Sequence, residues 1–242
     1  MSTFLSVIIP AHNEENRLPG TLEQVFRFLE KQSFTYEVIV VENGSVDKTL
    51  EIAQTFAQAH PAFRVMQSER GKGAAVRRGM LEAMGEYCFM CDADLSMPVE
   101  EIAKFIPPSL QDFDIAIGSR EAKGSVRYNE PPYRHLGGRG INFIIQLFIL
   151  PGLNDTQCGF KCFRADVAKD IFNFQTLHGW SFDIELLYIA RRRGYRVKEL
   201  PIHWYHFADS KVSALRDAIR MIQDIFQIHA NAWRGMYDRN AR

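Results

Sequence analysis

The chain has 242 residues, 46% of them hydrophobic, which is enough for one sizeable core. Its 29 basic and 29 acidic residues cancel, which argues against bulk electrostatic binding of nucleic acid because such binding needs an excess of positive charge. The 4 cysteines form no secreted disulfide pattern and the N-terminus does not resemble a signal peptide, so we expect a cytoplasmic protein.

The first half of the chain alternates apolar runs with amphipathic segments. Strands are predicted at Phe4–Pro10, Tyr36–Val41, Phe63–Met66 and Tyr87–Cys91, and helices at Pro19–Lys31, after Asp47 and at Gly71–Met84. This alternation predicts an α/β fold, a Rossmann-like and mostly parallel sheet with helices on both faces. Polar clusters follow three of the strands, and ligands of such sheets bind outside the carboxyl ends of the strands. We therefore expect the clusters to converge on one crevice.

The second half is less regular. We predict strands at Ile115–Gly118 and residues 160–164, a loop at Gly124–Gly138, a helix over residues 182–193 and an amphipathic helix over Val212–Trp233. The apolar run Ile141–Leu153 is shorter than the roughly 20 residues of a membrane span and suits a buried or interfacial helix. The predicted division is a main domain at residues 1–211 and a helical tail at 212–242.

Asp92-Ala93-Asp94 is the sharpest chemical signal. Two carboxylates directly after a buried strand repel each other, and a hard divalent cation, Mg²⁺ or Mn²⁺, relieves the repulsion while it binds a diphosphate. A solvated acidic turn is the alternative for an isolated triplet of this kind. The strand-end position and the neighbouring clusters favour the metal site.

Other polar residues belong to the same rim. Glu42 ends a neighbouring strand, where a carboxylate can accept hydrogen bonds from a base or a ribose, although a simple turn residue is the alternative. Pro10, Asn13 and Glu14 follow the first strand. Lys72 stands between two glycines at a helix start, where backbone N–H groups favour an anion such as phosphate.

Two cysteine pairs, Cys88/Cys91 and Cys158/Cys162, have spacings that suggest zinc. Cys88 and Cys91 lie on one strand, however, where residues three apart face opposite sides. We therefore expect buried thiols.

Seven motifs occur in a defined order: SVIIPAHNEE, VIVVENGSVDKT, ERGKGAAVRRGM, DADLS, IGSR, DTQCGFK and WSFDIELLYIA. In this order they resemble the inverting family 2 glycosyltransferases with a GT-A fold, most of all the polyprenyl (dolichyl) phosphate sugar transferases of the glucosyl type. The resemblance spans residues 6 to 212. It implies transfer of a hexose, glucose, from a UDP-sugar rather than a GDP-sugar to a polyprenyl phosphate, with Mg²⁺ or Mn²⁺ as cofactor.

The resemblance also implies roles for individual residues. The nucleotide-sugar and the acceptor would be bound by Pro10, Asn13, Glu14, Glu42, Lys72, Asp92, Arg134 and Gln157. The metal would be held by Asp92, Asp94 and His206. The catalytic residues would be Asp94, Arg120, Arg139 and Asp183. Glu42-Asn43 replaces the usual Asp-Asp pair. Ser96 replaces a glutamine that is frequent in mannosyl relatives, and this second difference disfavours a mannosyl donor.

The acceptor decides the mechanism. A phosphate monoester, with its second pKa of about 6, is already largely ionised near neutral pH, so it needs positioning and charge neutralisation by arginines more than a base. A saccharide or other hydroxyl acceptor would need Asp183 as base. The chain lacks the glycine-rich first loop of a nucleotidylyltransferase, and a non-catalytic nucleotide-sugar binding module would bind without turnover.

The apolar run Ile141–Leu153 and the tail helix leave two interpretations open. Insertion into a membrane interface would make the protein peripheral on the cytoplasmic face and deliver a polyprenyl phosphate. Packing against the domain itself, or against a second copy in a homodimer, fits the same pattern.

Overall fold

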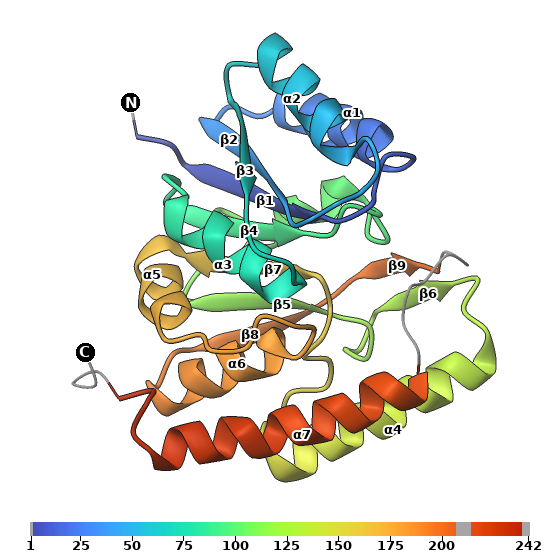
Figure 1. The fold of residues 1–242 in the computed structure, drawn as a ribbon, viewed down its shortest axis with the longest axis vertical. Helices are drawn as coiled ribbons and strands as arrows, with labels where there is room; N and C mark the ends of the chain where they lie inside the picture. Colours follow the sequence, from blue (N-terminus) through green and yellow to red (C-terminus); the bar gives the residue numbers. More distant parts are fainter. Residues whose placement is uncertain (1, 207–213, 239–242) are drawn as a thin grey trace.

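A seven-stranded sheet forms the centre of the computed structural model, which describes residues 2–206 and 214–238 (Figure 1). The strands are β1 (Leu5–Ala11), β2 (Tyr36–Glu42), β3 (Phe63–Gln67), β4 (Tyr87–Cys91), β5 (Ile115–Ser119), β6 (Val126–Tyr128), β7 (Phe160–Arg164), β8 (Val197–Pro201) and β9 (His203–Tyr205). The order in the main sheet is β3-β2-β1-β4-β7-β5-β8, and β6 pairs with β9 in a small second sheet. Only β7 runs antiparallel to its neighbours in the main sheet.

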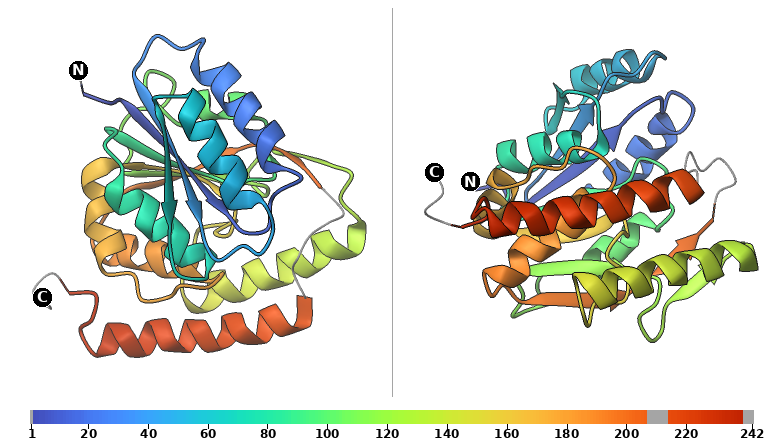
Figure 2. Two further views of the ribbon diagram at one scale, coloured as in Figure 1. Left: turned by 45° about the horizontal axis from the view of Figure 1, so that its top comes forward. Right: turned by 60° about the horizontal axis from the view of Figure 1, so that its bottom comes forward.

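Helices cover both faces of the sheet. They are α1 (Leu18–Leu29), α2 (Thr49–Ala59), α3 (Lys72–Glu82), the 3₁₀ helix η1 (Val99–Lys104), α4 (Pro132–Phe148), α5 (Ala165–Asn173), α6 (Phe182–Arg192) and α7 (Ala214–Trp233). Residues of α1, α2 and η1 share one apolar cluster, and residues of α3, α5 and α6 share the other. The long helices α4 and α7 contact each other on the latter side, and α7 also contacts α6 (Figure 2).

The alternation of side chains along each strand produces these two clusters. On β4, Cys88 packs into one cluster and Cys91 into the other, as predicted. All four cysteines are free and buried, and burial raises the pKa of Cys88 and of Cys158 to about 12. The prediction of buried thiols is confirmed.

The predicted loop Gly124–Gly138 is wrong in part, because it contains β6 and the first turns of α4. Pro132 opens that helix, and proline is well suited to a first helical position because its missing N–H has no intrahelical partner there. The strands β8 and β9 and helix α5 were not predicted. The predicted boundary between residues 211 and 212 lies outside the described residues, so the two-part division stays a prediction.

Several strands of the main sheet end at the same edge. The parallel strands β1, β2, β4 and β5 end there at Ala11, Glu42, Cys91 and Ser119. Because β7 is antiparallel, it begins at the same edge, with Phe160 opposite Cys91. The segment that precedes β7 therefore meets the segments that follow β4 and β5.

Candidate active site

The rim of the site at β2 is built around Glu42, which is buried. Its carboxylate accepts hydrogen bonds from the backbone N–H of Ser45 and from Gln67 Nε2, the latter at 3.1 Å. Burial alone would raise the pKa of Glu42, but these hydrogen bonds outweigh burial and hold the pKa below its ordinary value. Only β1 separates Glu42 from the end of β4, which corresponds to roughly 10 Å at the usual strand spacing.

The turn after β1 is tied to the turn after β2. The backbone N–H of Asn13 donates to Ser45 Oγ at 3.0 Å, and Asn13 Oδ1 accepts from the N–H of Val46 at 2.9 Å. Pro10 is buried near the end of β1, and the carboxylate of Glu14 forms an ion pair with Arg17 at 2.6 Å. The structure thus brings the predicted nucleoside residues to one rim.

Lys72 and Asp92 form the central contact of the site. Lys72 Nζ lies 2.6 Å from Asp92 Oδ1, and the Trp180 ring centroid lies 5.2 Å from the same ammonium group. Burial raises the pKa of Asp92, an effect that Lys72 opposes and the nearby charge of Asp94 reinforces. The pKa of Lys72 lies above its ordinary value because the surrounding carboxylates outweigh its burial. The site thus concentrates negative charge that one lysine only partly compensates.

The donor set around Asp92 suits a hard cation. Asp94 Oδ1 accepts the backbone N–H of Ser96 at 2.9 Å. Two carboxylates together with diphosphate oxygens and water are a typical ligand set for Mg²⁺. Among residues 2–206 and 214–238, no three His, Cys, Asp or Glu side chains form a metal-binding group by themselves. The substrate would therefore have to supply part of the coordination.

His206 lies at the edge of the described chain. Its backbone N–H donates to Tyr128 O at 3.0 Å, and its ring lies 5.7 Å from that of Trp204. Since no three-residue group is found among the described residues, His206 is not brought together with Asp92 and Asp94 in one. Its metal role stays a prediction.

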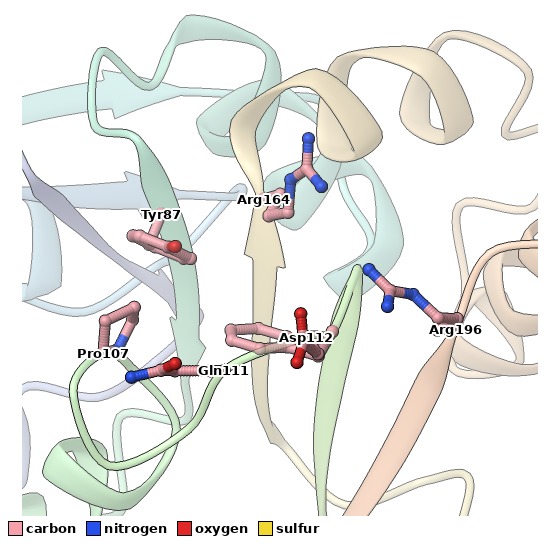
Figure 3. A pocket seen from close by; sticks show the side chains of 7 residues that line it. Tyr87, Pro107, Gln111, Asp112, Arg164 and Arg196 are labelled. Carbon is pink, nitrogen blue, oxygen red and sulfur yellow. The ribbon is translucent and has the colours of Figure 1, made fainter.

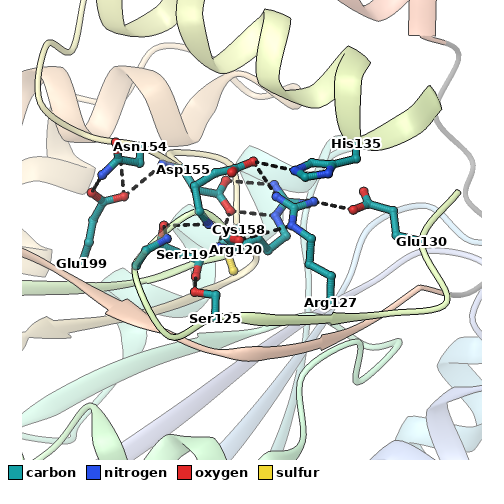
Figure 4. Close-up of polar contacts among 12 residues, drawn as sticks. Ser119, Arg120, Ser125, Arg127, Glu130, His135, Asn154, Asp155, Cys158 and Glu199 are labelled. Atoms are coloured by element: carbon teal, nitrogen blue, oxygen red, sulfur yellow. Dashed lines mark hydrogen bonds and ion pairs between the residues drawn. The ribbon is translucent and has the colours of Figure 1, made fainter. Parts of the chain in front are cut away.

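Arg120 is held by Asp155, a residue that is buried in the segment before β7 (Figure 4). Arg120 Nε and Nη2 donate to the two oxygens of Asp155 at 2.7 and 2.8 Å, and the Trp204 ring centroid lies 5.5 Å from the guanidinium carbon. Burial would raise the pKa of Asp155, but the charge of Arg120 outweighs it and lowers that pKa. This bidentate pair fixes the direction of the guanidinium group.

Arg127 and the two further predicted arginines, Arg134 and Arg139, differ from Arg120. Arg127 is bound to Glu121 and Glu130 at 2.6 Å each, so two carboxylates compensate its charge, whereas Arg120 is paired with one among the described residues. Arg139 is exposed on α4 and has no hydrogen-bond or ion-pair partner within the described part of the chain. The side chain of Arg134 lies outside the described structure, and its role stays a prediction.

Asp183 stands in the first turn of α6 and is buried. Its Oδ1 lies 2.7 Å from Nζ of Lys161, without the alignment of a hydrogen bond. The charge of Asp183 contributes to raising the pKa of both Lys72 and Asp92, so Asp183 faces the same site. Gln157 is half-buried in the segment before β7.

Sequence reasoning missed four residues that the structure places at the candidate site. Asp155 holds Arg120, Lys161 pairs with Asp183, and Trp180 covers Lys72. A Cβ atom at Gly159 would lie 1.8 Å from Asp92 Oδ2, so a larger residue there would force the Asp92 carboxylate to move. The motifs DTQCGFK and WSFD contain all four, but their contacts depend on the antiparallel β7.

A pocket of ≈ 230 Å³ lies elsewhere, lined among others by Tyr87, Arg164 and Arg196 (Figure 3). Tyr87 begins β4 and Arg164 ends β7, so this pocket is at the edge of the sheet opposite Asp92. A second pocket lies between α2 and β3. Neither contains the predicted site residues.

The chain is similar to several known proteins. The family profile described as "Glycosyl transferase family 2" matches residues 6–172. A dolichyl-phosphate beta-glucosyltransferase of Drosophila melanogaster is 38% identical, covering 96% of this chain and 78% of the relative; the enzyme of that name from Homo sapiens is 33% identical, covering 95% and 77%. A crystal structure of glucosyl-3-phosphoglycerate synthase from Mycobacterium tuberculosis with Mn²⁺, UDP-glucose and phosphoglyceric acid has a TM-score of 0.66 at 16% identity, covering 94% of this chain and 80% of that one. At that identity the structure shows the shared GT-A fold.

Proposed function

This chain belongs to glycosyl transferase family 2, and on that premise we propose that it transfers glucose from UDP-glucose to a polyprenyl phosphate of the dolichyl type. The fold and the enzyme class, a glycosyltransferase, follow from the family. The names of the curated relatives support the sugar and the acceptor, and the structural neighbour with UDP-glucose and Mn²⁺ supports the donor and a divalent cation. The observation that carries the proposal is the joint placement of Lys72, Asp92 and Asp94 at the edge where the parallel strands end.

The donor half of the site is the rim from β1 to β4. Glu42 and the turn of Asn13 would bind the nucleoside, and Asp92 with Asp94 would hold Mg²⁺ or Mn²⁺ against the diphosphate. The bound cation neutralises the diphosphate as leaving group. Lys72, fixed by Asp92 and Trp180, adds a further positive charge close to that point.

The acceptor half is the side of Arg120. The Asp155 carboxylate holds the guanidinium group in one orientation, which suits a planar contact with phosphate oxygens. A phosphate that is already ionised needs no base for in-line attack, and such an attack inverts the anomeric configuration. Asp183 is committed to a buried ion pair with Lys161, which favours a role in charge placement.

We place the acceptor side at a membrane surface, with the protein bound peripherally on the cytoplasmic face. Within the described residues, no helix combines the length and apolar character that a membrane span requires. Helix α4 starts two residues after Glu130, which pairs with Arg127. The helix contains no acidic residue and exposes Arg139, Phe143 and Leu147 at intervals of four residues. A basic and apolar face of this kind suits a lipid surface that carries anionic headgroups.

Helix α7 extends this apolar surface. His229 Nε2 lies 3.1 Å from the backbone oxygen of Phe148, so the end of α4 adjoins α7. Exposed apolar side chains follow one stripe of α7: Ile219, Ile222, Phe226 and Trp233. We call these residues together with Phe143, Leu147 and Phe148 the apolar surface.

The test is a donor screen. UDP-glucose, GDP-mannose and UDP-galactose are each incubated with Mg²⁺ or Mn²⁺ and a polyprenyl phosphate, and nucleoside diphosphate release and lipid-linked sugar are measured. We expect lipid-linked glucose from UDP-glucose, lost by at least about 10²-fold in Asp94→Asn because a charged metal ligand is removed. Turnover only with a saccharide acceptor would replace the proposed acceptor, and UDP binding without turnover under every condition would refute it.

A further inference from the structure

We infer that Glu185 is a positioning residue: together with Tyr237 it holds the loop of residues 175–181, here called the site loop, against the start of α3. This loop carries Trp180, which covers Lys72. The inference deepens the proposed function and rests on it only where donor binding is concerned. The link between the C-terminal segment and the site loop does not depend on the proposed function.

Glu185 is a fully buried carboxylate on α6 that serves the site loop. Its oxygens accept hydrogen bonds from the N–H of Thr176 at 3.0 Å, from the N–H of Leu177 at 2.8 Å, and from the Thr176 hydroxyl. Within the described residues no cation is paired with it. A buried charge satisfied only by hydrogen bonds is costly to disturb, so the loop backbone and the carboxylate constrain each other.

The C-terminal segment supplies the remaining partners. Tyr237, which is buried beyond the end of α7, donates its hydroxyl to Glu185 Oε1 at 2.8 Å. Asn231 on α7 donates to Thr176 Oγ1 at 2.9 Å. Burial and the adjacent Glu185 charge raise the pKa of Tyr237, so its hydroxyl keeps its proton and remains a donor. Helix α7 and its last turn are thus tied directly to the site loop.

At its other side the site loop packs on the first turn of α3. The backbone oxygen of His178 accepts the N–H of Ala74 at 3.3 Å, and Gln175 Nε2 donates to the oxygen of Gly73 at 2.9 Å. A Cβ atom at Gly71 would lie 2.3 Å from His178 O, so the two backbones are in close contact. Lys72 lies between these two glycines.

The contacts form one continuous path from α7 through Tyr237 and Glu185 to the site loop, and from there to Lys72 and Asp92. The same helix α7 carries part of the apolar surface on another face. The arrangement therefore makes the position of Trp180 over Lys72 depend on how the C-terminal helix is seated. Contacts that only stabilise the fold would not need to extend to Lys72, which contacts Asp92.

The test is Tyr237→Phe in the full chain, which removes one hydroxyl and keeps the ring in its buried place. We expect amide hydrogen exchange at Leu177 and Ala74 to accelerate at least about fivefold, the effect of losing one net hydrogen bond. We expect the Kd of UDP with Mn²⁺ to rise about three- to tenfold and the melting temperature to fall by only about 2–4 °C. Glu185→Gln should enlarge all three effects.

The matched control is Asp238→Asn, which removes the exposed ion pair from Asp238 to Arg192 at 3.0 Å but leaves Glu185 untouched. It should leave both amides and the UDP affinity unchanged. Unchanged exchange at Ala74 in Tyr237→Phe overturns the coupling, and faster exchange with unchanged UDP affinity overturns the positioning role. If wild-type protein binds no UDP, the proposed function fails, while the exchange at Ala74 still decides the coupling.

Discussion

Gly159 lies so close to Asp92 that a Cβ atom at position 159 would stand 1.8 Å from Oδ2 and 2.3 Å from the carboxyl carbon. The contact follows from the antiparallel β7, which starts directly opposite the end of β4. With Asp92 in this position, a side chain at position 159 has no space. The carboxylate of Asp92 is thereby confined between the Gly159 backbone and the ammonium group of Lys72.

Gly159→Ala should therefore displace the Asp92 carboxylate. We expect cation-dependent UDP binding and turnover to fall at least about tenfold, because ligands misplaced by even 1 Å lose much of their effect. Isothermal titration with UDP and Mn²⁺ measures the loss. Gly20→Ala is the control, since nothing lies within 4 Å of a Cβ atom at this position of α1. Equal affinity of Gly159→Ala and wild type would show that Asp92 does not bind the donor complex.

The sequence predicts the first half of the fold better than the second. Strands β1, β2 and β4 could be predicted because each is a short apolar run bounded by turn residues. The edge strand β8 is half-buried along its whole length and carries Lys198 and Glu199, so it has no apolar pattern. Helix α4 contains Gly137, Gly138 and Gly140, which oppose helix formation, so the local sequence favours the loop that was predicted there.

The site residues, too, were predicted only where a local sequence pattern identifies them. Asp92 and Glu42 were found because they follow apolar strands, and the rule of strand ends applies to any parallel sheet. The pairs of Arg120 with Asp155 and of Asp183 with Lys161 join segments from 22 to 35 residues apart. No local spacing predicts them, since they depend on where the antiparallel strand enters the sheet.

The pair of Arg120 and Asp155 should make stability depend on pH. The folded pKa of Asp155 lies below its ordinary value of 3.8, so its contribution is complete above that value and is lost as pH falls through the folded pKa. Asp155→Asn leaves Arg120 without its partner. We expect a loss of about 2 kcal/mol near pH 7, below the usual cost for a fully buried pair because Arg120 is partly exposed.

Urea unfolding of wild type and Asp155→Asn between pH 7 and pH 2 measures this contribution. The difference in unfolding free energy should be constant at higher pH and shrink below pH 3.8. Asp166→Asn is the control, because its pair with Arg164 is exposed and should contribute less than about 0.5 kcal/mol. A difference that does not vary with pH would contradict the assigned pKa shift.

Replacement of Asp183 distinguishes a phosphate acceptor from a hydroxyl acceptor. For a phosphate acceptor, Asp183→Asn should keep kcat within about tenfold, whereas loss of a general base costs about 10²–10⁴-fold. The substitution also leaves Lys161 buried without a counter-charge, which should cost about 3 kcal/mol of stability. Turnover is therefore measured at low temperature, where the variant stays folded.

The double variant Lys161→Met/Asp183→Leu is the matched control for that stability cost. Removal of both charges should restore much of the lost stability, because two buried partners are replaced by apolar side chains. If its kcat with polyprenyl phosphate remains within about tenfold of wild type, the carboxylate is no base. A loss of about 10³-fold or more in both variants would assign a hydroxyl acceptor instead.

Phe226→Glu should weaken binding to lipid vesicles through the apolar surface. Phe226 is 71% exposed on the stripe of α7 that adjoins α4, and its insertion into an interface should contribute about 2 kcal/mol, so we expect at least tenfold weaker binding to vesicles with 30% phosphatidylserine. Gln227→Glu adds the same charge to an exposed neighbouring position and should weaken binding by about fivefold, because one charge near the surface is worth about 1 kcal/mol. Equal effects of the two variants would show that charge alone, and not insertion of Phe226, determines vesicle binding. Loss of a dimer in Phe226→Glu, with no vesicle binding by wild type, would assign the apolar surface to a second copy of the chain.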